Sequence, residues 1–314
     1  MQHYRLALIF WLAAAFTLPV TPAQADRDAA LEQLLLERDS PDAFAAAIET
    51  ARNAGISEQG ILEARFLFHV DRGEYAKIAA LKPEFLKRRE IFNIEESEIF
   101  ATEEDWLAVT EYVQALDALQ KNDAASFKKH ITEAFWLSPG QGAAFAPHIE
   151  KARLAEAMKE VRVDFNTRLV TLHQGEAIPI SKINTDAPAT LLHFWSPWSR
   201  ECEATLPDFT ATAVELAKHG IAVISILPEQ SPEVREDALE MIKPLGANPP
   251  GAWLLDRARL PLAGTLRVRN LPAMVLLDPD GAVLFNGHPA DAALWKALAT
   301  VAPEMARPEP AAHE

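Results

Sequence analysis

Residues 193–207 read HFWSPWSRECEATLP, and this stretch decides the fold. The apolar run at 189–194 leads into it and predicts a buried strand. Ser199 then stands where a helix can begin, because a serine side chain accepts hydrogen bonds from the free amides of a first turn. Cys202 lies on that first turn and is the only cysteine of the 314 residues. A single cysteine forms no internal disulfide, so we expect packing alone to stabilise the chain.

Strand and helix patterns alternate after residue 163. Short apolar runs bounded by turn residues predict strands, and longer runs with helical spacing predict helices. The predicted strands are 169–172, 178–180, 189–194, 221–227, 252–255, 273–277 and 282–285, and the predicted helices are 199–220, 231–245 and 290–301. Such an order predicts an α/β domain of three layers around one sheet.

The quoted stretch and this order of elements resemble the thioredoxin-like superfamily in its exported TlpA-like branch. The matching motif is F-W-x-x-W-C-x-x-C-x-x-x-x-P, and the resemblance covers residues 163–303. It implies a thioredoxin-like domain in which Ser199 replaces the attacking cysteine and Cys202 keeps the place of the resolving one. It also implies that Leu271 and Pro272 form a peptide-docking groove, with a cis-proline facing the active-site helix.

The replacement at Ser199 removes half of the chemistry that the resemblance implies. A thiol–disulfide cycle needs one thiolate to attack and a second to resolve the mixed disulfide. The turn of Trp198, Ser199, Arg200 and Glu201 is therefore predicted to be a degenerate active site. Our first hypothesis is a binding or scaffold module, because pairing with an extended peptide needs no cysteine.

The alternative hypothesis is an enzyme, a monothiol oxidoreductase that uses Cys202. The helix N-terminus and Arg200 would lower the pKa of the thiol, whereas burial, Glu201 and Glu203 would raise it. A buried thiol behaves as a small apolar group. Exposure of Cys202 therefore decides between the two hypotheses.

Residues 26–161 show helical spacing throughout and predict an all-α domain of helical hairpins. Ser40 followed by Pro41 marks one helix start, and Ser57 marks another. Apolar stripes predict which faces are buried: Tyr75, Ile78, Ala79 and Leu81; then Trp106, Val109, Val113, Leu116 and Leu119; then Phe127, Ile131, Ala134 and Phe135. This layer is a candidate second docking surface.

The first residues predict export. Arg5, the apolar run 6–20 and the small residues 23–25 are typical of a secretory signal peptide, here residues 1–25. We expect a periplasmic or extracellular protein with no stable membrane span after signal cleavage. Residues 304–314 are rich in proline, alanine and glutamate and predict a disordered tail.

The net charge and the absence of certain motifs exclude several classes of partner and cofactor. The net charge of −15 disfavours nucleic acid, whose phosphates it would repel. The nine histidines show no pair at short ligand spacing, and the chain has no glycine-rich phosphate loop, so we expect no metal site and no cofactor. The expected partner is a protein or peptide of the cell envelope.

Overall fold

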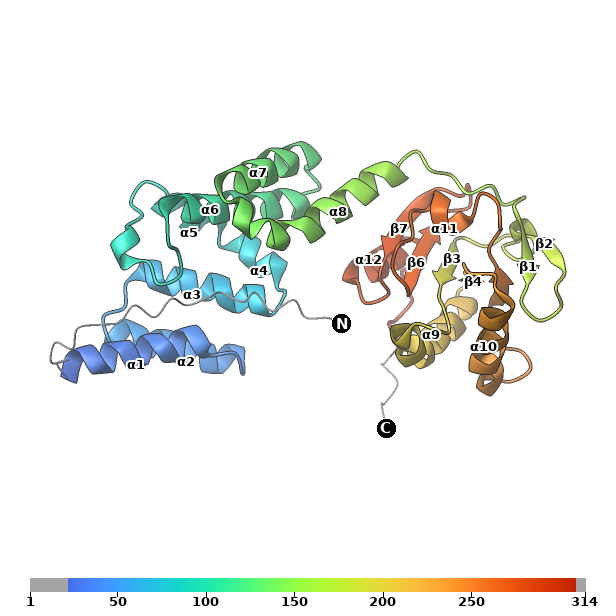
Figure 1. Cartoon of the computed structure of the whole chain (residues 1–314), viewed down its shortest axis with the longest axis horizontal. Helices are drawn as coiled ribbons and strands as arrows, with labels where there is room; N and C mark the ends of the chain where they lie inside the picture. Colours follow the sequence, from blue (N-terminus) through green and yellow to red (C-terminus); the bar gives the residue numbers. More distant parts are fainter. Residues whose placement is uncertain (1–21, 309–314) are drawn as a thin grey trace. The chain divides into compact units, whose positions relative to one another are not determined.

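A computed structural model describes residues 22–308 of the chain (Figure 1). Contacts divide it into two units, one ending at Ala152 and the other beginning at Arg153. Most of the predicted signal peptide, residues 1–21, lies outside the described residues, and residues 22–25 open the first helix. Within residues 22–308, no helix is both long enough and apolar enough to cross a bilayer.

The first unit is built of helices whose starts are marked by side-chain caps. Ser40 Oγ accepts from the Ala43 amide and Ser57 Oγ from the Gly60 amide, as the sequence predicts. The helices are α1 (Pro22–Leu36), α2 (Pro41–Asn53), α3 (Glu58–Asp71), α4 (Tyr75–Ala80), α5 (Lys82–Arg88), α6 (Glu103–Gln120), α7 (Ala124–Leu137) and the first part of α8 (Gly142–Met158), with short 3₁₀ turns at Ile94–Glu96 and Pro139–Gln141.

Helix α6 forms the centre of this unit. Trp106 is fully buried and stacks on Phe85 and Phe92, with ring centroids 4.9 and 4.7 Å apart. The predicted stripes of α6 and α7 meet as a helical hairpin, apart from Phe135, whose side chain is 48% exposed. Phe135 instead covers Gly142, where an added Cβ would lie 2.7 Å from its ring. Tyr75 is likewise exposed, so these two stripe assignments were wrong.

The second unit contains one mixed sheet in the order β2-β1-β5-β4-β3-β6-β7. Strands β3, β4 and β5 are parallel, while β6 runs antiparallel to β3, and β7 antiparallel to β6. The strands are β1 (Arg168–Thr171), β2 (Ala177–Pro179), β3 (Thr190–Phe194), β4 (Ala222–Leu227), β5 (Ala252–Leu255), β6 (Ala273–Leu277) and β7 (Val283–Gly287). These bounds lie within two residues of the predicted ones.

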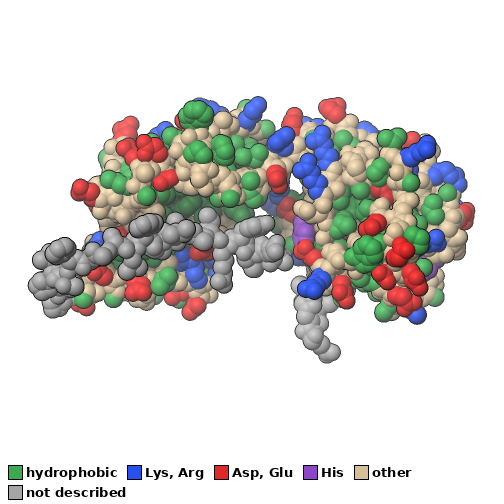
Figure 2. All heavy atoms as spheres, in the orientation of Figure 1, with side chains coloured by type: hydrophobic (Ala, Val, Ile, Leu, Met, Phe, Trp, Pro, Cys, Tyr) green, Lys and Arg blue, Asp and Glu red, His purple; other side chains and the backbone are tan. Residues whose placement is uncertain are grey.

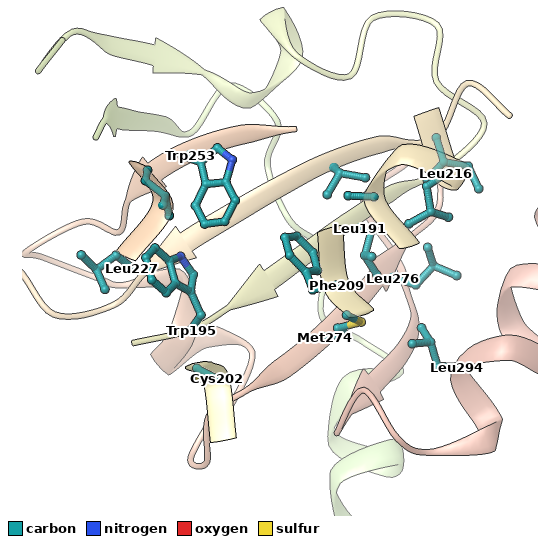
Figure 3. Packing of buried hydrophobic residues seen from close by; sticks show 14 of the residues in the cluster. Leu191, Trp195, Cys202, Phe209, Leu216, Leu227, Trp253, Met274, Leu276 and Leu294 are labelled. Carbon is teal, nitrogen blue, oxygen red and sulfur yellow. The ribbon is translucent and has the colours of Figure 1, made fainter. Parts of the chain in front are cut away.

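Successive side chains of the central strands point alternately to the two faces of the sheet and pack into two cores, one on each face. On one face, Leu191 and Val223 pack under α9 (Arg200–Lys218), α10 (Pro232–Ile242) and α12 (Ala292–Val301), as Figure 3 shows in part. On the other face, Leu192 and Ile224 pack under α11 (Leu262–Thr265) and the end of α8. The predicted fold class is confirmed: a thioredoxin-like three-layer α/β domain follows an all-α domain of helical hairpins.

The turn between β6 and β7 shows how local chemistry fixes the edge of this sheet. Asp278 Oδ1 accepts from the amides of Asp280 and Ala282, and Gly281 has φ +77°. The carbonyl oxygen of Val163 occupies the space that a Cβ on Gly281 would need. Only glycine fits this position without strain.

Part of the predicted disordered tail lies among the described residues. Met305 packs against the core beneath α9 and α12, and the guanidinium of Arg307 lies 5.4 Å from the centroid of the Trp295 ring. Residues 309–314 of that tail lie outside the described residues.

Candidate functional site

Ser199 is the N-cap of helix α9. Strand β3 ends at Phe194, and a short turn leads to Ser199, whose backbone is extended at φ −94° and ψ 112°. Its Oγ accepts a hydrogen bond from the Cys202 amide at 3.3 Å. This is the capping role expected of a serine here, because the first amides of a helix have no partner within it.

The same hydroxyl reaches the segment before β6. Ser199 Oγ donates to the carbonyl oxygen of Leu271 at 3.3 Å, and the Leu271–Pro272 peptide bond is cis. Strand β6 pairs with β3 so that Ala273 faces Phe194, and the two chain segments therefore meet at one edge of the sheet. Pro272 is buried and Leu271 is half-buried. The structure thus brings together Ser199 and Leu271, which the sequence analysis assigned to one site.

Cys202 is buried on the first turn of α9, with 3% of its surface exposed. It belongs to the same core cluster as Trp195 (Figure 3). Burial is the main cause that raises the pKa of the thiol; a hydrogen bond with the Ser199 hydroxyl opposes it, and the charge of Glu201 adds to it. The thiol is therefore protonated at neutral pH and covered, neither of which suits a nucleophile.

Arg200 and Glu201 lie on the outer side of the same turn. Arg200 is exposed, and the burial of the thiol outweighs the pKa-lowering effect that the sequence analysis expected from it. Glu201 Oε1 lies 2.9 Å from His288 Nε2. The Nδ1 atom of His288 accepts from the Ala290 amide, while its Nε2 has no partner with hydrogen-bond geometry among the described residues.

The two tryptophans of the turn have opposite environments. Trp195 is buried and meets Trp253 edge to face, with centroids 5.2 Å apart. Trp198 is 58% exposed, and its indole Nε1 donates to Asp237 Oδ2 of α10 at 2.7 Å. The exposed Trp198 ring is therefore held in place beside Ser199. Asp237 was not predicted as a site residue, because nothing in the sequence spacing links α10 to this turn.

His193 is a second residue whose environment the sequence did not reveal. It lies in β3, stacks on Phe209 with centroids 3.7 Å apart, and places Nδ1 3.4 Å from Ser225 Oγ. Burial lowers its pKa to about 3, so the ring is neutral at neutral pH. The hydrogen-bond partners of Ser199 Oγ are the Leu271 carbonyl and the Cys202 amide, neither of which is a base that could activate a serine.

A cavity of about 290 Å³ lies beside α9 and reaches Glu201 of the turn. Its lining includes His193, Glu201, His288 and Trp295, and does not include Ser199, Trp198 or Leu271. Within residues 22–308, no group of three or more histidine, cysteine, aspartate or glutamate side chains is placed to hold a metal ion.

Solved structures resemble about half of this chain at low sequence identity. A thioredoxin-like protein from Aeropyrum pernix is 20% identical, with 51% of this chain and 99% of that chain covered and a TM-score of 0.36. A secreted disulfide oxidoreductase of Mycobacterium tuberculosis, homologous to DsbE of Escherichia coli, is 20% identical, with 43% and 96% covered and a TM-score of 0.34. A conserved protein of unknown function from Bacteroides fragilis is 21% identical, with 44% and 99% covered and a TM-score of 0.35.

No family model matches this sequence, and no curated protein matches it. The second unit has a thioredoxin-like fold, as its own strand order and the helices that cover both faces of its sheet show. Its activity has to be argued from the residues of the site.

Proposed function

We propose that this chain is a thioredoxin-like binding module that has lost dithiol–disulfide exchange. The single observation that carries this proposal is the position of Ser199, whose hydroxyl accepts from the Cys202 amide and donates to the carbonyl of Leu271. An oxygen in this place forms no stable bridge to a substrate sulfur, so the attacking step of the exchange is lost.

The surface around Ser199 supports binding of an extended peptide. Trp198 offers an exposed aromatic face that Asp237 holds in place. Leu271 lies just before the paired part of β6, and among the described residues its amide has no hydrogen-bond partner. A free backbone amide and an exposed aromatic ring, both close to Ser199, are suited to an extended segment, which binds through main-chain hydrogen bonds and side-chain contacts.

The burial of Cys202 argues against the alternative, a monothiol oxidoreductase. A thiol must be both accessible and ionised to attack a disulfide, and Cys202 has 3% of its surface exposed and a raised pKa. In this proposal the thiol is a core group that packs beneath the turn.

The proposal includes export and a second surface. Export is supported by the sequence of residues 1–25, which has a basic start, an apolar stretch and small residues before Asp26. A second docking surface on the helical unit is supported by Trp136 of α7, which is 80% exposed beside the exposed Phe135. Exposed aromatic pairs of this kind are frequent at protein interfaces.

The test uses a fluorescein-labelled insulin B chain whose cysteines are carbamidomethylated, so that no disulfide chemistry is possible. We expect the full-length protein to bind it, with the same affinity after Cys202→Ala and with affinity weakened about tenfold after Trp198→Ala. The control is Ile91→Ala, which removes an exposed apolar side chain from the helical unit, away from both proposed surfaces, and should leave the affinity unchanged. Loss of binding in Cys202→Ala, or no binding by the wild type, would contradict the proposal.

A further inference from the structure

Positive charge is concentrated in one segment beside the candidate site. Between Asp256 and Asp278 the chain has four arginines and no acidic residue, although its net charge is −15. The four are Arg257, Arg259, Arg267 and Arg269. We call residues 257–270, which contain all of them, the arginine loop.

The four arginines have no neutralising partner among the described residues. The ion pairs of residues 22–308 all involve other side chains. Arg259, Arg267 and Arg269 are exposed, and the buried Nε of Arg257 has no hydrogen-bond acceptor. Their charges are therefore available to a ligand.

The sheet topology places this loop at the same edge as Ser199. The arginine loop begins at the end of β5 and leads to the start of β6. Strands β3, β4 and β5 are parallel, so the end of β5 lies at the same edge of the sheet as the end of β3, from which the chain leads to Ser199 and α9. Its backbone is anchored: the Asp256 carboxylate accepts from the amides of Leu262 and Ala263 at 2.8 and 2.9 Å. Arg269 stands two residues before Leu271.

The opposite side of the site carries negative charge. Glu229, Glu233, Glu236 and Asp237 are exposed at and before the start of α10, and Asp237 holds Trp198. On the face shown in Figure 2, acidic side chains gather where α9 and α10 lie in Figure 1. The candidate site therefore lies between an arginine loop and an acidic helix start.

We propose that the partner segment is an extended acidic peptide whose carboxylates lie against the arginine loop. This inference rests on the proposed function, because it names the class of peptide that the site binds. Opposite charges across an interface raise the association rate and select among partners. A continuous phosphate backbone fits less well, because the acidic start of α10 repels it, whereas a peptide can carry its negative charge at one end.

The test compares labelled twelve-residue peptides built from Glu-Val-Ser repeats with the same peptides carrying Gln or Lys in place of Glu. With the full-length protein we expect the Glu peptide to bind about tenfold more tightly than the Gln peptide. The preference should shrink between roughly 50 and 300 mM NaCl, because salt screens surface charges. The Lys peptide should bind more weakly than the Gln peptide.

Two double variants separate a local effect from one of net charge. Arg259→Glu with Arg269→Glu should abolish the preference for the Glu peptide. Lys128→Glu with Lys129→Glu changes the net charge equally on exposed positions of α7 and should keep the preference.

The outcomes distinguish the two proposals. If the Glu and Gln peptides bind equally, or if the arginine variant keeps the preference, the acidic-partner inference fails while peptide binding stands. If none of the peptides binds and the carbamidomethylated B chain does not bind either, the proposed function fails as well. Tighter binding of a twenty-nucleotide single-stranded DNA at the same salt would overturn the assignment to a peptide.

Discussion

The Ser199 hydroxyl and the Leu271 carbonyl, 72 positions apart in the sequence, are joined by a hydrogen bond of 3.3 Å. The same oxygen caps helix α9 through the Cys202 amide. One side chain therefore couples the start of a helix to the segment that leads into β6. In the proposed function, this oxygen stands where an attacking sulfur would be needed, so the site keeps its local structure without dithiol exchange.

Ser199→Ala should destabilise the protein more than the loss of an ordinary cap. Removing a serine N-cap costs about 1 kcal/mol, and losing the bond to Leu271 adds about 1 kcal/mol. Ser231→Ala is the matched control, because Ser231 caps α10 through the Val234 amide. Urea unfolding should show the larger loss for Ser199→Ala. Equal losses would mean that the Leu271 contact contributes nothing.

Ser199→Cys should restore a dithiol. The substituted residue would lie three positions before Cys202 at the start of α9, where the present hydroxyl accepts from the Cys202 amide at 3.3 Å. We expect a disulfide under mild oxidation and a gain of insulin reduction, because the added thiol can attack a substrate disulfide and Cys202 can resolve the mixed disulfide. Mass spectrometry of alkylated samples detects the bridge.

The control for this substitution is Ser231→Cys at the start of α10. It adds a thiol at another helix cap, away from the turn that holds Cys202. It should form no intramolecular bridge and give no activity. A Ser199→Cys protein that stayed fully reduced would show that Ser199 does not occupy the attacking position.

Cys202 should react with a thiol reagent only when the protein unfolds. Its exposed fraction is 3% and burial raises its pKa, so both access and ionisation oppose alkylation. Labelling with iodoacetamide at pH 8, with and without denaturant, measures this. Rapid labelling of the native protein would favour the monothiol enzyme.

His193 should make the stability of the protein fall in acid. Its folded pKa is about 3 because burial disfavours the charged ring, whereas an unfolded histidine titrates near 6.5. The contribution of the neutral His193 ring to the free energy of unfolding is fully present above pH 6.5. It is lost as the pH falls towards 3, because only the unfolded chain takes up the proton in this range. The slope is about 1.4 kcal/mol per pH unit for one proton.

The comparison of wild type with His193→Leu isolates this contribution. The variant should lose stability less steeply between pH 6 and 4, whatever its absolute stability. His148, whose pKa burial lowers to about 4, contributes equally to both proteins. Parallel pH curves for the two proteins would contradict the assigned pKa of His193.

The sequence predicted the α/β unit well because its signals are local. Strand β3, the cap at Ser199 and the turn before Gly281 each follow from a few neighbouring residues. The resemblance placed Leu271 near the turn, and the structure adds the hydrogen bond that joins the two. Spacing alone could not reveal the Trp198–Asp237 bond or the burial of His193, because both depend on which helix covers the sheet.

The helical unit was harder to predict in detail. Helix α8 has no single apolar stripe, because Phe145 packs in the core of the first unit and Met158 in a core of the second. The error at Phe135 has a similar origin. Its neighbour Ala134 faces α6, and one further residue turns the side chain by about 100° to the surface.

The loss of dithiol exchange is tested most directly by disulfide turnover with the purified wild-type protein. The measurement follows insulin reduction by dithiothreitol with increasing protein concentration. We predict a rate equal to that without the protein, because Ser199 provides no attacking sulfur. A rate that rises in proportion to the wild-type protein, and that Cys202→Ala abolishes, would contradict the proposed function.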